Sequence, residues 1–186
     1  MRARQVKGVD AGAPLAQNAR RIALVRVDEL YSFAPRALDP ARKRALHDMR
    51  IAAKRLRYLL EVAEPALGPG AKRGAKEAKA LQGLLGDIHD CDEMLRFVDD
   101  HLRRLRADDS VAVHLSAAAD AEDLDAALVR AAPNRTRYRG VESLRTWLQA
   151  RRALLHERFA ERWAKLEAGG FRQELESSLA GEDGAG

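Results

Sequence analysis

Between residues 46 and 61, LHDMRIAAKRLRYLLE, charged and apolar residues recur with the period of an α-helix. At about 100° per residue, the apolar side chains of this stretch gather on one face of the helix. Beside that face, the cations and one histidine fall within an arc of about 80°. They are Lys43, His47, Arg50, Lys54 and Arg57. Tyr58, Ile51 and Val62 border the arc on its other side. The pattern predicts an amphipathic helix with one row of cations between two apolar borders.

This row has the length of a linear ligand. Lys43 and Arg57 are fourteen positions apart, about 21 Å at 1.5 Å per residue. Cations so close together repel one another, which favours an anion between helices. A row one turn apart matches a linear polyanion better than a single phosphate. The alternative is a solvated face whose long side chains lie over neighbouring apolar surface.

Two other stretches have similar rows. Near the C-terminus, Arg145, Arg152 and His156 lie within roughly 60°, beside an apolar stripe. That stripe consists of Leu144, Leu148, Leu155 and Phe159. Lys72, Lys76 and Lys79 follow helical spacing after the loop Gly68-Pro69-Gly70. Either row is also compatible with a plain basic surface.

Composition favours helices throughout. The chain is 46% hydrophobic and 33% charged but only 5% aromatic, with few β-branched runs. The net charge of +5 points weakly to an anionic partner. Cys91 is the only cysteine, which suits a reducing compartment. No apolar run approaches the roughly 18 to 20 residues of a membrane span, and no signal core follows the N-terminus. We therefore expect a cytoplasmic all-α domain.

Proline and glycine set the expected helix boundaries. Ala34-Pro35 should end a first helix, Asp39-Pro40 should cap and begin a second, and Glu64-Pro65 should end it. Asp108-Asp109-Ser110 should cap a weaker helix. The expected helices span about 14–33, 40–63, 72–106, 110–131, 141–167 and 171–179. We expect one bundle of about five to six helices over residues 13–180, between flexible ends at 1–12 and 181–186.

The doublets His47-Asp48 and His89-Asp90 suggest a second interpretation. Helical metal-dependent phosphohydrolases of the HD type use such doublets, and Asp92, Glu93 and His101 could add ligands. However, cations one turn from His47 disfavour a divalent metal there. We instead expect Gln82 and Asp90 to be interior polar groups that orient the basic row.

Nucleic acid is a further alternative ligand. The positive charge suits phosphate contacts. The sequence lacks a recognition-helix turn and zinc-ligand spacing. Almost no aromatic residue lies among the basic ones, and Trp147 and Trp163 fall near core positions. We expect only weak, non-specific binding at low salt.

Two ordered motifs resemble the CHAD family, the conserved histidine α-helical domain. His47, Arg50 and the cluster Lys54-Arg55-Leu56-Arg57 match its first motif in order. Leu81-Gln82, Leu85-Gly86 and Asp90 match its second. The similarity is strongest over about residues 40 to 100.

The resemblance implies a helical domain whose basic residues line a groove or pore that binds inorganic polyphosphate, often at polyphosphate granules. The family carries its basic motif twice, whereas this chain has one clear copy. The row Arg145, Arg152 and His156, or a homodimer, would then complete the pore. We predict a non-catalytic domain without cofactor or metal. All three rows together would bind polyphosphate, and His47 would bind it better when protonated.

Overall fold

The computed structural model describes residues 3–118 and 122–180, and helices are the only regular structure among them. The α-helices are α1 (Leu15–Ala37), α2 (Lys43–Leu67), α3 (Pro69–Leu115), α4 (Tyr138–Ala168) and α5 (Phe171–Ala180). A 3₁₀ helix, η1, spans Ala126–Ala131. The all-α prediction is confirmed. The tail expected at 181–186 lies outside the described residues. In the part described, no helix is both long and apolar enough to cross a membrane.

The chain divides into two compact units. The first unit contains Met1–His89 and Ala153–Gly186, and the second contains Asp90–Arg152. Both α3 and α4 contribute residues to each unit. Each unit is described by itself below.

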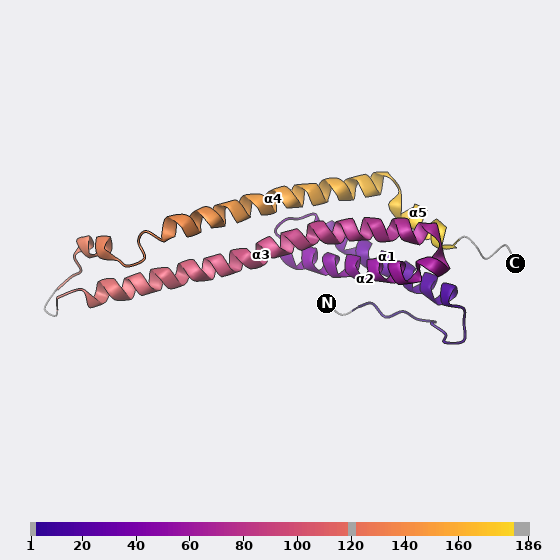
Figure 1. The fold of residues 1–186 in the computed structure, drawn as a ribbon, viewed down its shortest axis with the longest axis horizontal. Coiled ribbons are helices and arrows are strands. Elements are labelled where there is room, and N and C mark those ends of the chain that lie inside the picture. Colours follow the sequence, from indigo (N-terminus) through magenta and orange to yellow (C-terminus); the bar gives the residue numbers. More distant parts are fainter. Residues whose placement is uncertain (1–2, 119–121, 181–186) are drawn as a thin grey trace. The chain divides into compact units, whose positions relative to one another are not determined.

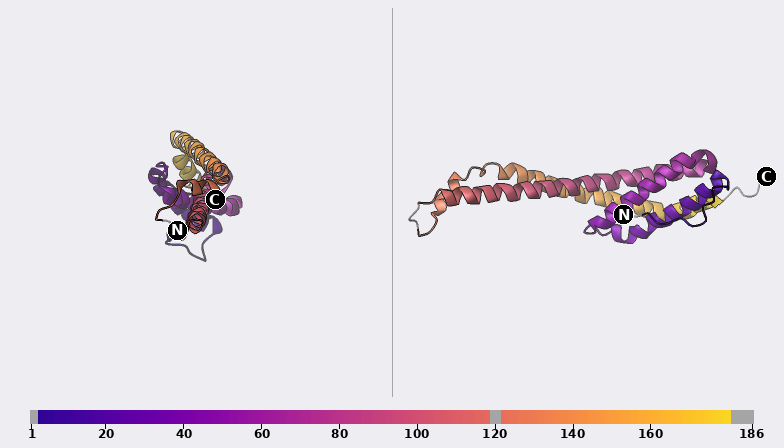
Figure 2. Two further views of the ribbon diagram at one scale, coloured as in Figure 1. Left: turned by 90° about the vertical axis from the view of Figure 1, so that its left-hand side faces the viewer. Right: turned by 90° about the horizontal axis from the view of Figure 1, so that it is seen from below.

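In the first unit, α1, α2 and the first part of α3 run up and down beside one another (Figures 1 and 2). Two contacts define the register of α2 on α3. The rings of His47 and His89 lie 5.0 Å apart, and Lys72 Nζ lies 3.6 Å from Glu64 Oε1. As residue numbers rise along α2 they fall along α3, so the two helices are antiparallel. The same register sets Lys54 opposite Gln82.

The core of the first unit combines leucines with many alanines. Its fully buried large side chains include Leu30 of α1, Met49 and Leu56 of α2, and Phe159 of α4. Ala23, Ala52, Ala53, Ala71 and Ala78 are also inaccessible. Small side chains let the helices approach closely, and helical periodicity predicted this face of α2 correctly.

A buried carboxylate joins α1 to α2. Glu29 is only 1% exposed. Its Oε2 accepts a hydrogen bond from Arg26 Nη1 at 2.6 Å, and its Oε1 accepts one from Arg55 Nη1 at 2.9 Å. Two arginines therefore compensate one buried charge, as buried ions require.

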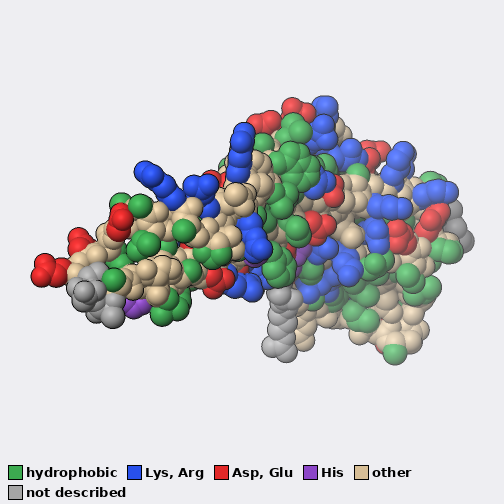
Figure 3. Space-filling model, turned by 60° about the vertical axis from the view of Figure 1, so that its left-hand side comes forward, with side chains coloured by type: hydrophobic (Ala, Val, Ile, Leu, Met, Phe, Trp, Pro, Cys, Tyr) green, Lys and Arg blue, Asp and Glu red, His purple; other side chains and the backbone are tan. Residues whose placement is uncertain are grey.

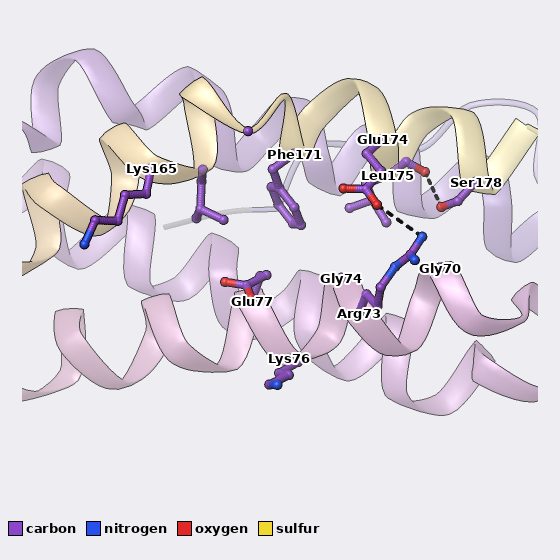
Figure 4. Close-up of a pocket in the computed structure, with 12 residues that line it drawn as sticks. Gly70, Arg73, Gly74, Lys76, Glu77, Lys165, Phe171, Glu174, Leu175 and Ser178 are labelled. Carbon is purple, nitrogen blue, oxygen red and sulfur yellow. Dashed lines mark hydrogen bonds and ion pairs between the residues drawn. The ribbon is translucent and has the colours of Figure 1, made fainter.

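Two glycines of α3, Gly70 and Gly74, lie where α5 packs against that helix. A Cβ atom at Gly74 would lie 2.8 Å from Leu175 Cδ1 and 2.9 Å from Leu60 Cδ1, and one at Gly70 would overlap Ser178. In Figure 4, Phe171 and Leu175 of α5 point toward α3, and Arg73 reaches Glu174. The absence of side chains at these two glycines thus lets α5 pack directly on α3.

The second unit is an antiparallel helical hairpin with a small core. Leu95, Val98 and Leu102 of α3 pack with Leu148 of α4, and Tyr138 and Val141 border them. Leu144 and Trp147, expected in or near a core stripe, are 42% and 56% exposed. That expectation is wrong for both residues, because only one narrow side of α4 meets α3.

Both proline-based helix ends are wrong. Pro35 and Pro65 lie inside the last turns of α1 and α2. Each proline lacks a backbone N–H and so removes one hydrogen bond from the last turn. The helix nevertheless continues past it. Gly68, with φ 75°, ends α2, and its N–H donates to the carbonyl of Glu64 at 2.8 Å.

Two expected helix starts are also wrong. Asp39 lies in a turn and accepts from the N–H of Ala41 at 2.9 Å, so α2 begins only at Lys43. Asp109 lies within α3. Its carboxylate accepts from the N–H of Asn134 at 2.9 Å and from the hydroxyl of Tyr138. Asp109 therefore does not cap a new helix. It links α3 to the segment that leads into α4.

Replacing Glu29 by alanine should lower the free energy of unfolding by about 3 kcal/mol, because two partly buried arginines lose their counter-charge. Chemical denaturation followed by circular dichroism measures the change. Glu93→Ala is the control, since Glu93 forms an exposed ion pair with Arg96. The control should change stability by less than about 0.5 kcal/mol. Equal effects of the two variants would contradict the role given to Glu29.

Candidate functional site

The five residues of the row predicted between Lys43 and Arg57 lie on α2, and the ring of His47 packs against that of His89 on α3. Lys43 and Lys54 are exposed, whereas His47, Arg50 and Arg57 are half-buried. Arg50 Nε lies 3.6 Å from the position a Cβ would take at Gly86. The guanidinium of Arg50 therefore lies against α3 at Gly86, a position without a side chain. We call this strip of α2 and α3, from His47 and His89 to Lys79, the basic seam.

Three buried polar atoms of the basic seam have no hydrogen-bond partner among the described residues. They are Arg50 Nε, Arg57 Nε and Gln82 Oε1. Arg57 Nε has only a long ion pair, 3.6 Å from Glu61 Oε1. Buried polar groups are nearly always hydrogen-bonded, so these atoms are available to bond to a ligand or an ordered water.

Tyr58 holds two of the cations in place. Its ring lies 4.3 Å from Arg57 Cζ and 5.7 Å from Lys54 Nζ. Both distances are within the range of a cation–π interaction. The aromatic border of the row thus orients cations without neutralising their charge.

The lysines of α3 are placed differently from one another. The antiparallel register sets Lys79 opposite Arg57, at the edge of the basic seam. Lys72 pairs with Glu64. Lys76 lies further round α3 and borders a cavity of about 320 Å³ between α3 and α5. In Figure 4 its side chain points away from α5. Lys79 is the lysine that best extends the row.

His47 and His89 form a close pair at one end of the basic seam. Their ring planes are tilted by 55°. Burial and the neighbouring His89 lower the pKa of His47 below its ordinary value of 6.5, with Arg50 and Arg44 contributing and Asp48 opposing them. His47 is therefore largely neutral at pH 7 in the unliganded protein, and a bound anion would favour its protonation.

The residues of the row predicted on α4 have other partners, and His156 lies in the core of the first unit. His156 is 7% exposed, its Nε2 lies 3.1 Å from the carbonyl of Ala37, and its ring packs edge-on against Phe159. It is a core residue, so its prediction as a ligand-facing residue is wrong.

Arg145 and Arg152 belong to the second unit. There, Arg152 Nε donates to Asp92 Oδ1 at 2.7 Å, and Arg145 Nε donates to Asp99 Oδ1 at 2.6 Å. The acids of α3 thus compensate both cations. The sequence could not reveal this pairing, which depends on the register of the hairpin.

The groups suggested as metal ligands are occupied or exposed. Asp92 binds Arg152, Glu93 binds Arg96, and His101 is exposed. Asp90 is exposed too, so its prediction as an interior group is wrong. Within residues 3–118 and 122–180, no group of three His, Cys, Asp or Glu could hold a metal ion.

Sequence reasoning missed His89 as a partner of His47. Gln82, Gly86 and His89 follow i, i+4, i+7 spacing, which places them on one face of α3. Only the register shows that this face meets the cations of α2. On the face drawn in Figure 3, Lys and Arg side chains gather beside a histidine.

The comparisons with known proteins give one match. The model of the CHAD domain family matches residues 2–99, more than half of the 186 residues. The matched span includes α1, α2 and the part of α3 that carries Lys79, Gln82 and His89. No curated protein and no solved structure matches the chain.

Replacing His89 by asparagine should raise the pKa of His47, because a neighbouring ring that opposes its protonation is removed. An NMR titration of the imidazole protons between pH 4.5 and 8, roughly the range over which histidines titrate, measures it. His114→Asn, at an exposed position of α3, is the control and should leave His47 unchanged. An unchanged pKa in the His89 variant would show that the two rings do not interact.

Proposed function

The chain belongs to the CHAD family, and from this premise we propose that its first unit binds inorganic polyphosphate along the basic seam without catalysing a reaction. The family is associated with polyphosphate binding. The observation that carries the proposal is the pair of buried, unsatisfied donors Arg50 Nε and Arg57 Nε in one row with His47.

The side chains of the row suit phosphate chemistry. A guanidinium donates forked hydrogen bonds to phosphate oxygens, and an ammonium adds a mobile point charge. Arg50 and Arg57 are two turns apart, about 10 Å along α2. Only a ligand with anionic groups at several successive positions satisfies both arginines and Lys54 at once. Polyphosphate has this property, whereas orthophosphate does not.

Desolvation strengthens the case for a strongly anionic ligand. Arg50 and Arg57 are half-buried, so water screens their mutual repulsion incompletely. Their approach costs free energy in the unliganded protein, and a polyanion between them recovers it. We therefore propose binding, in the cytoplasm and at polyphosphate granules, as the role of this unit. Nucleic acid should bind through the same charges, but more weakly.

The variant with Arg50→Glu and Lys54→Glu should bind long-chain polyphosphate at least about 100-fold more weakly, because charge-assisted hydrogen bonds contribute about 1.5–3 kcal/mol each. Isothermal titration calorimetry at moderate salt measures the affinity. The matched control is Arg21→Glu with Lys165→Glu, which changes the net charge equally at two exposed positions on α1 and α4. Both variants should keep the helical circular dichroism spectrum. Equal affinity of the wild type and the Arg50 variant would place the site elsewhere.

Affinity should also rise as the pH falls below about 6.5, since protonated His47 adds a positive charge to the row. The pKa of His47 is lowered in the unliganded protein, so the increase should be small at pH 7 and grow toward pH 5. His47→Gln should remove most of this pH dependence while retaining binding at pH 7.5. The same pH dependence in wild type and variant would exclude His47 as the group responsible.

One titration series separates the rival functions. Long-chain polyphosphate, duplex DNA and triphosphate are compared across salt concentrations. Affinity for polyphosphate should exceed that for DNA at every salt concentration, with a log–log slope set by the number of phosphates contacted. Release of orthophosphate with added Mg²⁺ or Mn²⁺ would instead support a phosphohydrolase. Equal affinities for DNA and polyphosphate would support a non-specific polyanion binder.

A further inference from the structure

Eight large apolar side chains are exposed among the described residues of the second unit, and four of them lie within five positions of Asp99 or Arg145. Met94 and Phe97 of α3 are 47% and 59% exposed, and Leu144 and Trp147 of α4 are 42% and 56% exposed. The core of the hairpin, around Leu95, Val98, Leu102 and Leu148, covers none of them.

These four residues share one face of the hairpin. The ion pairs Asp99–Arg145 and Asp92–Arg152 lie along one edge of the α3–α4 contact. Phe97 and Trp147 each stand two positions from a member of the first pair, about 160° around their helices. Both aromatic rings therefore lie on the side opposite the ion pairs. The same pairs place Phe97 and Trp147 at the same height along the hairpin. Around its surface, Met94 and Leu144 lie between these two rings. We call this surface the aromatic face.

The charges flanking the aromatic face on α3 are self-complementary. Asp90, Phe97 and Arg104 follow one another at intervals of seven residues, within an arc of about 40°. Asp90 and Arg104 are exposed, and neither forms an ion pair among the described residues. If two copies of α3 cross antiparallel at Phe97, Asp90 of each copy faces Arg104 of the other. A two-fold interface requires this reciprocity.

Area and net charge also permit self-association. About half of four large side chains, each of roughly 150–250 Å², gives about 400 Å² of apolar surface per copy. This is about half of the roughly 800 Å² per partner of a standard interface, and the flanking polar residues have to supply the rest. Residues 90–152 contain twelve Asp or Glu and eleven Arg, so two copies repel one another little.

We propose that the aromatic face is the interface of a homodimer. Two hairpins pack antiparallel about a two-fold axis at Phe97 and Trp147, with reciprocal ion pairs between Asp90 and Arg104. This proposal does not rest on polyphosphate binding. Its ligand is a second copy of the chain.

Sedimentation velocity of the full chain over a range of concentrations tests the proposal. The wild type should sediment as a dimer that dissociates on dilution. Phe97→Asp should weaken association at least about 100-fold, because central aromatic residues carry most interface energy. Val62→Asp, at an 80% exposed position of α2, is the matched control and should leave the dimer unchanged.

The charge swap identifies the geometry. Asp90→Arg and Arg104→Asp should each weaken the dimer about tenfold by placing like charges opposite one another. The variant with both changes restores opposite charges and should dimerise within about threefold of the wild type. A wild type that stays monomeric, or a dimer that Phe97→Asp does not weaken, would overturn the proposal. Failure of the double variant to recover would overturn the antiparallel arrangement.

Discussion

The burial of one face of α2 is the constraint on which the first unit depends. Leu46, Met49, Leu56 and Leu60 are buried together, so α2 cannot rotate about its axis without exposing them. The neighbouring strip of α2 is thereby held against α3, and that strip carries the cations. Hydrophobic packing thus supplies the free energy that keeps like charges close together. The ordering of the basic seam is a consequence of the core beside it.

The arginines of the motif Lys54-Arg55-Leu56-Arg57 have different roles although they are neighbours in sequence. Arg55 pairs with the buried Glu29 of α1, whereas Arg57 packs against the ring of Tyr58. Two residues along a helix correspond to a rotation of about 200°. One arginine therefore joins helices inside the unit while the other keeps an unsatisfied donor. Motif membership does not by itself make a residue part of a binding surface.

Helical periodicity predicted what depends on one helix alone. It identified the fold class and the buried face of α2. It failed where a contact depends on how helices meet. His156 follows the spacing of a basic row, yet its Nε2 lies within hydrogen-bond distance of the carbonyl oxygen of Ala37 on α1. Arg145 and Arg152 meet acids of α3. These contacts depend on which residues of two antiparallel helices lie opposite each other. No local pattern in a single sequence specifies that.

The docking of α5 on Gly70 and Gly74 relies on shape, with exposed ion pairs such as Arg73–Glu174 adding little. Dispersion and apolar contacts of this kind persist in concentrated salt, and buried ions such as Glu29 are poorly screened. Contacts between exposed cations and a phosphate polymer are weakened under the same conditions. High ionic strength should therefore weaken polyanion binding and leave the packing of the helices intact. Under the proposed function, a high-salt wash should strip co-purified polyanion from the protein and leave the protein folded and able to bind again.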